Sequence, residues 1–337
     1  MKSFWLALAV GSSLIVKMDA QSNPPPPSVQ EDPYVWLEDI TGEKALNWAR
    51  ERNGEAAAEL EGNDSFRALE TQILEILDSN FKLPYVTKYG AYFYNLWRDS
   101  QHPRGLWRRT TLEEYRKAEP QWEVVLDVDA LGAAEKESWV FHGAEFLKPD
   151  YRRCLVSLSR GGSDASEVRE FDTQTKTFVE NGFRLPQAKS NVSWIDRDTL
   201  FVGTDFGPNS MTTSGYPRVA KRWKRGEALS EAKTVYEAEA TDMTAEAFHD
   251  ATPGFERDFI TRRPSFFTNE QYLIKADGSK QKIDLPLDAA LVEPDRLVPR
   301  GGPTGHESRE RSIRRHRVID RLARDARRVD GGGRALG

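Results

Sequence analysis

The chain has 337 residues, with 53 acidic and 48 basic side chains and a net charge of −5. A hydrophobic content of 38% supports a sizeable core, which excludes a wholly disordered chain and fits one or two globular domains. The single cysteine, Cys154, excludes an intrachain disulfide framework and any cysteine-rich metal site. Its neighbours, Arg153 and Leu155-Val156, predict a buried strand residue, and a reactive thiol is the alternative.

Residues 1–20 have the order of a secretory signal peptide. A positive charge at Lys2 is followed by an apolar run over 4–16 and by small and polar residues through Ala20. About thirteen apolar residues are too few for a stable membrane span. Lys17 and Met18 depart from the pattern, and a buried or disordered segment is the alternative. The sequence predicts export to the periplasm or the medium, with the cytoplasm as the other location.

A proline-rich spacer over residues 21–30 precedes a helical segment that we place at 31–80. Helices are expected from Gly42 to Leu60 and from Ser65 to Ser79, with Asp64 or Ser65 as the N-cap of the second. The second helix has apolar residues on one face, at Phe66, Leu69, Ile73, Ile76 and Leu77. The two helices are expected to pack as an amphipathic pair.

Residues 81–290 read as short antiparallel strands, rich in β-branched and aromatic residues and separated by turn clusters at 88–90, 159–164 and 276–279. No helical pattern of 10 to 15 residues separates them, which disfavours a parallel α/β sheet. Four similar segments are marked by Val124, Phe178, Val235 and Ile283, at spacings of 54, 57 and 48 residues. Periods near 50 are typical of propeller blades, and a β-sandwich is the alternative.

Three segments resemble the N-terminal half of the prolyl oligopeptidase family of serine peptidases. They are Glu31-Asp-Pro-Tyr-Val-Trp-Leu-Glu-Asp39, Gly105-Leu-Trp-Arg-Arg-Thr110 and the run from Ser190 to Asp205. The similarity extends from about Glu31 to Ala290. It implies a seven-bladed propeller that caps a C-terminal α/β-hydrolase domain as its intramolecular partner. It also implies short peptides as substrates, usually cleaved after proline.

The catalytic residues that the resemblance implies are not found. The family nucleophile lies in a Gly-x-Ser-x-Gly turn, which this sequence lacks. Gly161-Gly162-Ser163 is the nearest imitation, and we interpret it as a hairpin turn rather than a nucleophile. The histidines are His102, His142, His249, His306 and His316. Outside the arginine-rich tail, only His249 has an adjacent acid, Asp250, and we expect that pair in a surface loop. No catalytic residue is therefore assigned.

The sequence predicts no metal site and no cofactor. Motifs for zinc, calcium and nucleotide phosphates are absent, and Asp196-Arg197-Asp198 is better explained as a charged turn than as a cation site. The longest loop-like stretch, 206–217, either faces the hydrolase domain and the substrate passage or is a plain connection between strands. Substrate-binding residues and the lining of the channel stay unassigned.

The tail, residues 291–337, differs in composition from the rest. From Val292 onward there are twelve arginines, no lysine and seven acids. The net charge is therefore +5 for this segment and −10 for the rest of the chain. No strand alternation is apparent after Leu291, so disorder or a reading-frame shift is expected. A solvated tail and a nucleic-acid arm are the alternatives. The tail has no aromatic residue to stack on bases, and no nucleic-acid partner is predicted.

The predicted fold is mainly β. It is a partial propeller of about four blades out of seven, preceded by an α-helical segment and without an α/β-hydrolase domain. The predicted function is that of the propeller portion of a prolyl oligopeptidase-like serine endopeptidase, inactive alone. The alternative is a non-catalytic, propeller-like module that binds peptides or glycans. Open propeller faces would make the isolated chain marginally stable.

Overall fold

The computed structural model describes residues 32–39, 41–79, 81–293 and 296–299. The chain divides into two compact units, Met1–Glu75 and Ile76–Gly337, which we describe separately. The predicted signal peptide, the whole proline-rich spacer and most of the tail, including His306 and His316, lie outside the described residues. In the part of the chain that is described, no helix is long and apolar enough to cross a bilayer.

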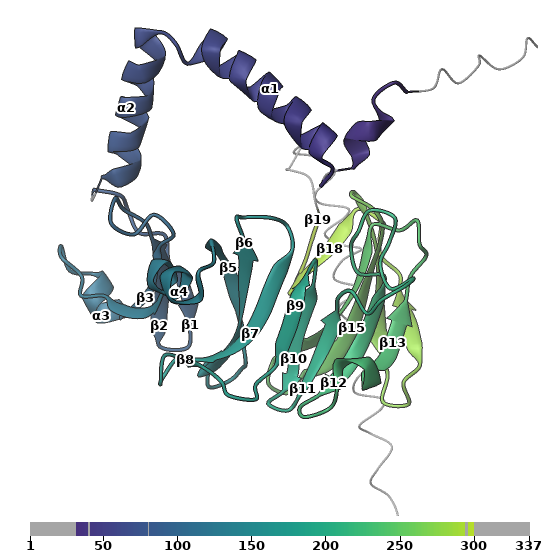
Figure 1. Cartoon of the computed structure of the whole chain (residues 1–337). Coiled ribbons are helices and arrows are strands. Elements are labelled where there is room, and N and C mark those ends of the chain that lie inside the picture. The colour runs from purple at the N-terminus through teal and green to yellow at the C-terminus, as the bar shows by residue number, and fades with distance from the viewer. Residues whose placement is uncertain (1–31, 40, 80, 294–295, 300–337) are drawn as a thin grey trace, which may run out of the picture. The chain divides into compact units, whose positions relative to one another are not determined.

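The N-terminal unit consists of helices. A 3-10 turn, η1 (Val35–Glu38), precedes α1 (Glu43–Leu60) and α2 (Asp64–Asp78), whose last residues continue into the second unit (Figure 1). The Trp36 and Trp48 rings meet edge to face at 6.3 Å, and the Lys44 ammonium lies over Trp36. The cap of α2 is Asn63, whose Oδ1 accepts the Phe66 amide at 2.8 Å, rather than Asp64 or Ser65.

The expected packing of α1 against the apolar face of α2 is wrong for the described structure. The five side chains of that face keep between 37 and 68% of their exposure, and α2 contains no buried residue. The apolar period identified the correct face, but it carries no information about which surface covers it. Ala45 is the buried residue of α1.

The second unit contains four antiparallel sheets in chain order, with a short pair of strands after them (Figure 1). The strands of the first two sheets are β1 (Thr87–Tyr89), β2 (Tyr92–Trp97), β3 (Leu106–Thr111) and β4 (Glu123–Asp127), then β5 (Trp139–Phe146), β6 (Arg153–Arg160), β7 (Ser166–Asp172), β8 (Thr177–Phe178) and β9 (Arg184–Ala188). The later strands are β10 (Asn191–Asp196), β11 (Thr199–Gly203), β12 (Val219–Lys224), β13 (Lys233–Glu237), β14 (Thr244–Asp250), β15 (Arg257–Ser265), β16 (Thr268–Ile274), β17 (Lys280–Ile283), β18 (Ala289–Glu293) and β19 (Arg296–Pro299).

This architecture confirms the predicted mainly β fold with about four propeller blades. The four repeat markers fall in β4, β8, β13 and β17, which is the fourth strand of each sheet. In the second sheet that position is shared, because β8 and β9 both pair with β7. We number the sheets 1 to 4 in chain order.

Each sheet buries its faces against its neighbours. On β6, Cys154, Val156 and Leu158 belong to an apolar cluster shared with sheet 1, whereas Leu155 belongs to a cluster shared with sheet 3. Successive strand residues point to opposite faces, so a strand buried on both sides is apolar at odd and even positions alike. A third cluster, centred on Phe201 and Ile260, joins sheets 3 and 4.

Short helices connect or flank the strands. They are α3 (Leu112–Tyr115), α4 (Val128–Glu135) and the 3-10 turn η2 (Leu229–Glu231). Helix α4 was not predicted, because its eight residues are too few to show a helical period, and its one signal in the sequence is Asp127 as an N-cap. The Asp127 carboxylate accepts the Ala130 amide at 2.9 Å and caps the helix.

The β18–β19 hairpin crosses the predicted boundary at 290/291. The expectation that strand structure stops at Leu291 is therefore wrong for residues 291–293 and 296–299. The signal in the sequence was Pro294-Asp295, a common turn pair between two short apolar runs. The dominant arginine composition of the later residues obscured it.

Candidate functional site

Ser163 lies in a hairpin turn, as predicted. The turn joins β6 to β7, and both Gly161 (φ 66°) and Gly162 (φ 87°) adopt the left-handed backbone that glycine favours. The Ser163 hydroxyl donates to the Ala165 carbonyl at 3.1 Å and accepts from the side-chain Nε2 of Gln187 at 3.4 Å. No histidine contacts it within the described residues, so nothing here activates it as a nucleophile.

The expectation that His249 and Asp250 occupy a surface loop is wrong. Both lie on β14, and Asp250 is buried. The His249 Nδ1 lies 2.8 Å from an oxygen of Asp258 on β15, and its backbone amide donates to Ser193 on β10. The acid partner of His249 is Asp258, which lies directly opposite it on the neighbouring strand. Asp250 is not the partner, because neighbouring residues of one strand point to opposite faces.

His142 contacts two serines, which nothing in the sequence indicated. Its Nε2 and Nδ1 lie 3.0 Å from the hydroxyls of Ser159 on β6 and Ser166 on β7. A bulge in β5 between Phe141 and Gly143 places the ring there. Ser159 is fully buried and no carboxylate orients the imidazole, so this cluster crosslinks strands and does not form a hydrolytic centre.

Cys154 is the buried strand residue that the sequence predicted. It is fully buried on β6, and burial, followed by the nearby Asp172 and Glu170 carboxylates, raises the pKa of its thiol well above the usual value. A neutral, inaccessible thiol is a poor nucleophile. The structure therefore favours the packing interpretation over a reactive thiol.

The remaining polar candidates are charged turns. Asp196 and Asp198 flank the β10–β11 turn, where Asp198 pairs with Arg225 at 2.9 Å. His102 Nδ1 lies 3.0 Å from an oxygen of Asp99 in the β2–β3 loop. No group of three or more His, Cys, Asp or Glu side chains with metal-binding geometry occurs in the described ranges.

No complete catalytic triad is formed by the residues that the structure describes. A hydrolytic serine needs a histidine that contacts it and an acid that orients the same ring. Over residues 32–39, 41–79, 81–293 and 296–299, His142 contacts only serines, and the rings of His102 and His249 contact only carboxylates. The described residues therefore offer contact surfaces rather than a hydrolytic centre.

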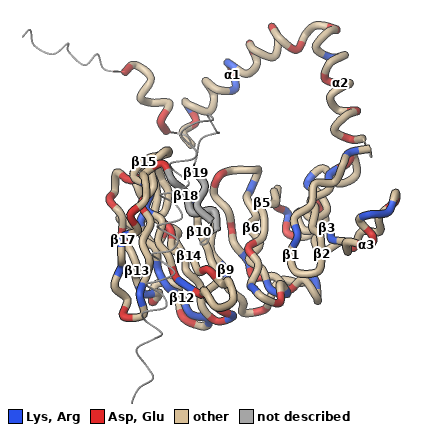
Figure 2. The backbone as a smooth tube through the Cα atoms, turned by 180° about the vertical axis from the view of Figure 1, so that it is seen from behind, with Lys and Arg blue, Asp and Glu red and all other residues tan. Residues whose placement is uncertain are grey.

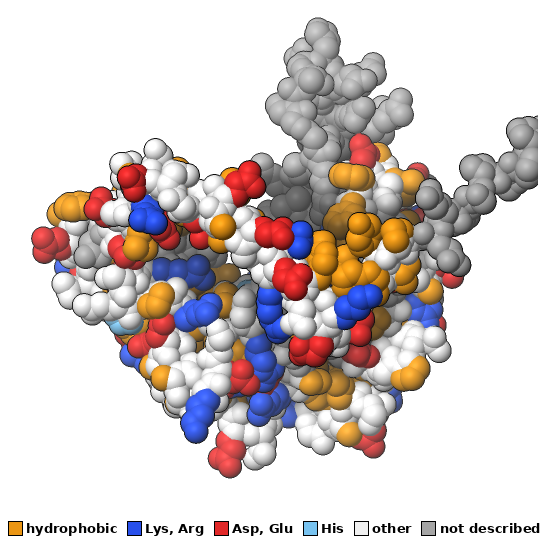
Figure 3. Space-filling view, turned by 45° about the horizontal axis from the view of Figure 1, so that its top comes forward, with side chains coloured by type: hydrophobic (Ala, Val, Ile, Leu, Met, Phe, Trp, Pro, Cys, Tyr) orange, Lys and Arg blue, Asp and Glu red, His pale blue; other side chains and the backbone are white. Residues whose placement is uncertain are grey.

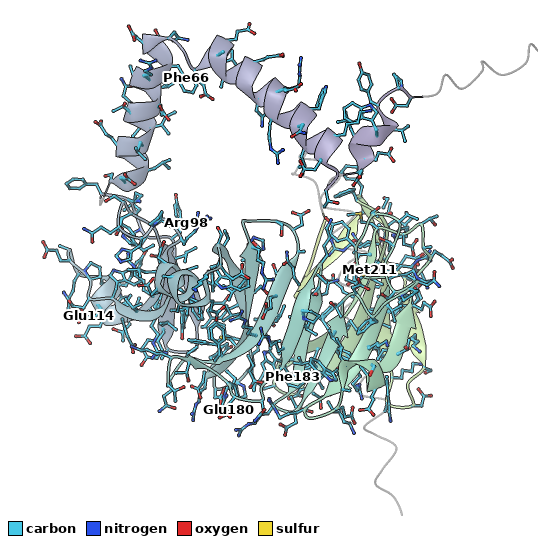
Figure 4. All side chains as sticks on the ribbon, in the orientation of Figure 1. Phe66, Arg98, Glu114, Glu180, Phe183 and Met211 are labelled. Carbon is cyan, nitrogen blue, oxygen red and sulfur yellow. The ribbon has the colours of Figure 1, made fainter. Side chains whose placement is uncertain are left out.

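One edge of the sheets carries the longest ordered loop, residues 204–218 between β11 and β12. The loops that join the second and third strands of the sheets lie on the same edge, because strand direction alternates in the same way in each sheet. Figure 4 labels Arg98 in the β2–β3 loop and Met211 in the β11–β12 loop at this edge, with Glu180 at the opposite one. We call it the Met211 edge.

The β11–β12 loop is held by its own hydrogen bonds. The Ser210 hydroxyl donates to the Gly207 carbonyl at 2.6 Å and accepts the Phe206 amide at 2.8 Å. Two nitrogens of Arg218 donate to the Asn209 carbonyl at 2.6 and 3.0 Å. These bonds fix the loop that the sequence analysis placed at 206–217.

The same loop is tied to the neighbouring sheets. The Thr213 amide donates to the Ala240 carbonyl at 2.8 Å, and the Ala245 amide donates to the Pro217 carbonyl at 2.9 Å, so sheet 4 supports one side. On the other side, the Lys189 ammonium lies 4.0 Å from the Tyr216 ring centre and 3.5 Å from Asp164 in the β6–β7 turn. Loops of three sheets therefore form one continuous surface.

Aromatic side chains project from the Met211 edge. Phe266 and Phe267 in the β15–β16 turn keep 67 and 82% of their exposure. Figure 3 brings this edge forward and shows a group of hydrophobic side chains beside lysines, arginines and acids. Exposed apolar groups rimmed by charge are typical of a protein contact surface.

A hollow of about 410 Å³ in sheet 2 is lined by charged residues. Its lining comprises Arg160, Glu167, Arg184, Pro186 and Gln187. Glu167 is buried and pairs with Arg184 at 2.6 Å and with Arg160 at 3.3 Å. Basic and acidic residues are interspersed along the sheets (Figure 2), and the charged side chains that line this hollow pair with one another, so it offers no unpaired charge for a ligand.

Comparison with known proteins identifies the family. The family profile described as prolyl oligopeptidase, N-terminal beta-propeller domain, matches residues 16–254. The chain belongs to the prolyl oligopeptidase family and contains propeller sheets of its N-terminal domain. The match ends just after β14, so sheets 1 to 3 lie within it.

Two curated relatives are peptidases without an assigned activity. The uncharacterized peptidase y4nA of Sinorhizobium fredii is 36% identical over 266 residues, which cover 77% of this chain and 36% of the relative. An uncharacterized peptidase of Rickettsia prowazekii is 30% identical over 269 residues, which cover 76% of this chain and 37% of the relative. The chain thus spans a little over a third of the length of these relatives.

Solved structures agree with the fold. A post-proline cleaving enzyme from Rickettsia typhi superposes with a TM-score of 0.70 and 31% identity, covering 76% of this chain and 39% of the enzyme. Oligopeptidase B from Leishmania major superposes with a TM-score of 0.58 and 16% identity, covering 75% of this chain and 34% of that enzyme. At this identity the similarity shows the fold alone.

Proposed function

We propose that this chain is the propeller portion of a serine endopeptidase that hydrolyses short peptides, usually after proline. In this proposal the nucleophile, acid and histidine belong to a hydrolase domain outside the chain, and the chain alone is inactive. The observation that carries the proposal is the family match over residues 16–254, which contain sheets 1 to 3, in a chain whose described residues form no complete triad. The similarity to the post-proline cleaving enzyme of Rickettsia typhi supports proline specificity.

The Met211 edge is our candidate for the surface that meets the hydrolase domain. Its loop 204–218 is pre-ordered, and Phe266 and Phe267 offer apolar contact area on the same edge. Such an edge would restrict access to a catalytic centre behind it without taking part in bond cleavage.

The test joins this chain to a catalytic partner. Residues 1–290 are fused to the C-terminal remainder of the Sinorhizobium fredii relative, and hydrolysis of a short chromogenic peptide with proline before the scissile bond is measured. We expect the fusion to cleave it and the chain alone to leave it intact, with an alanine-containing peptide as the matched substrate. Hydrolysis by the chain alone, or a folded fusion that does not prefer proline, contradicts the proposal.

The locus supplies a second check. Translating all three frames downstream of the codons for residues 285–300 should reveal further propeller repeats and a Gly-Gly-Ser-x-Gly-Gly turn if a frame shift produced the arginine-rich tail. A continuous frame followed by unrelated sequence contradicts the frame-shift explanation.

We also propose that the protein is exported, with cleavage after Ala20. The support is the charge and apolar pattern of residues 1–20, which lie outside the described residues. Mass spectrometry of the mature protein should find Gln21 at its N-terminus in an extracytoplasmic fraction. An intact Met1 in the cytoplasm contradicts this.

A further inference from the structure

The junctions between successive sheets share one type of contact. In each, an arginine of the later sheet binds one carboxylate through two of its nitrogens, and the acid comes from the earlier sheet or from the connection after it. We call this contact a clamp. At the junction of sheets 1 and 2, Arg169 Nη1 and Nη2 lie 2.7 and 3.0 Å from the two oxygens of Glu135, at the end of the connecting helix α4.

The next two junctions repeat the clamp. Arg225, which follows β12 in sheet 3, binds Glu170 of sheet 2 at 2.7 and 3.2 Å. Arg262 of sheet 4 binds Asp242, in the connection after sheet 3, at 2.7 and 3.0 Å. Bidentate pairs of this kind are strong and directional, and they fix how one surface meets another.

Aromatic rings stack on two of these guanidinium groups. Arg169 lies 4.9 Å from the Trp139 ring centre and 5.2 Å from that of Phe178. Arg225 lies 4.5 Å from the ring centre of Phe183, which Figure 4 labels. A clamp thus combines stacking on the guanidinium plane with a carboxylate at its edge.

Sheet 1 contains an arginine in the same setting but without the carboxylate. Arg108 lies on the third strand, β3, as Arg169 lies on the third strand of sheet 2. Its neighbour Trp107 packs in the cluster shared with sheet 2, so Arg108 faces the opposite side, away from sheet 2. Its guanidinium lies between the rings of Trp97 and Trp122, at 4.2 and 4.3 Å.

No carboxylate binds the edge of the Arg108 guanidinium within the described residues. Nε donates to Asn95 Oδ1 at 3.1 Å, and no carboxylate lies within 4 Å, which leaves both Nη groups without a partner. Burial lowers the pKa of Arg108 to about 10, and the more distant Asp99 only partly offsets this. Removing a cation from water costs free energy when no acid pairs with it. The position of Arg108 between two tryptophan rings therefore indicates that an acidic partner is missing.

The connection into sheet 1 does not supply the acid. Glu135 lies four residues before β5 and Asp242 two residues before β14. The corresponding segment before β1, residues 81–86, contains Lys82 and no acid. Of the two sources of acid seen in the clamps, this leaves a sheet, which supplies Glu170 to Arg225.

We infer that Arg108 binds an Asp or Glu carboxylate presented by a further propeller sheet that packs on the open face of sheet 1. The inference rests on the proposed function in one respect, namely that the intact protein contains more sheets than this chain. The same face offers apolar contact around the cation, with Phe93 stacked on Tyr115 and Val124 40% exposed. The surface that packs on this face of sheet 1 is therefore expected to be apolar, with one acid opposite Arg108.

The first experiment tests the carboxylate site in the full chain, independently of peptidase activity. Propionate, which mimics a glutamate side chain, is titrated while the Arg108 side-chain and Trp97 and Trp122 indole NMR signals are followed. We expect saturable shifts with propionate and none with the neutral isostere propionamide. Arg108→Gln should abolish the response, whereas Arg98→Gln, at an exposed arginine without an ion pair, should retain it. Equal responses to both probes, or shifts that survive Arg108→Gln, overturn the inference.

The second experiment identifies the occupant. The fusion with the Sinorhizobium fredii remainder is compared with its Arg108→Ala and Arg98→Ala variants by limited proteolysis at the end of sheet 1. Arg108→Ala should accelerate cleavage there tenfold or more, while Arg98→Ala should not. Association of the unfused chain that Arg108→Ala abolishes would assign the face to a second copy and overturn the further-sheet assignment. A fusion that shows the clamp but no hydrolysis would contradict the proposed function alone.

Discussion

Glu170 is a charged residue in a buried position, with 2% of its side chain exposed. Three groups satisfy its carboxylate. Arg225 binds both oxygens, the Phe183 amide donates at 3.0 Å, and Arg153 lies 3.7 Å away. A buried carboxylate is tolerated only while such partners remain, so the consequence of removing one is large.

Arg225→Ala is expected to lower the free energy of unfolding by about 3–5 kcal/mol, because it leaves the Glu170 carboxylate buried without its main partner. Asp198→Ala removes an exposed partner of the same arginine and should cost less than about 1 kcal/mol. Urea denaturation monitored by tryptophan fluorescence measures both. Similar losses in the two variants would show that the Glu170 pair contributes no more than a surface ion pair.

Cys154 should be unreactive in the folded protein and reactive after unfolding. Burial raises the pKa of its thiol, so almost no thiolate forms at pH 8. Because the folded pKa is raised, the neutral thiol contributes stability that is complete below the unfolded pKa, about 8.5, and is lost as pH rises through the folded value. Labelling with a disulfide reagent at pH 8, with and without urea, checks this. Rapid labelling of the native protein would contradict it.

At the scale of elements, strand identity followed from the sequence more reliably than helix packing. Each of the four repeat markers falls in a fourth strand, and the turn glycines Gly161 and Gly162 lie where a hairpin requires positive φ. Both signals are local, since they depend on alternation and backbone conformation. The uncovered face of α2 and the strand position of His249 depend on distant segments and were predicted wrongly.

The packing of sheet 4 on sheet 3 should depend on Ile260, which is fully buried on β15 beside Phe201 and Ala220. Ile260→Ala leaves a cavity at this junction and should lower the free energy of unfolding by about 2–5 kcal/mol. Hydrogen exchange should quicken in β14–β17 more than in β5–β8. Lys280→Ala, at an exposed position of β17, is the control. Uniform acceleration across both sheets would show that the sheets unfold only as one.

At the scale of the whole molecule, the two units are expected to unfold in separate steps. Within the described residues, Ala45 is the buried side chain of α1 and α2 has none, so packing contributes little to either helix. Isolated helices of 15 to 18 residues are marginal in water, whereas the sheets share continuous apolar clusters. Far-ultraviolet circular dichroism should therefore detect helix loss at a lower temperature than near-ultraviolet signals from the tryptophans. A single coincident transition would contradict this.

The sequence alone determined the fold class, the four-sheet repeat, the family and the structural role of Ser163 and Cys154. Each of these depends on a pattern within one segment or on a period along the chain. Only the tertiary structure decided that Asp258, and not Asp250, is the partner of His249, and that His142 joins two serines. The clamps and the unfilled edge of Arg108 likewise appear only in three dimensions. The reason is physical, because alternation along a strand determines which face a side chain occupies, whereas the packing of separate sheets determines what it meets there.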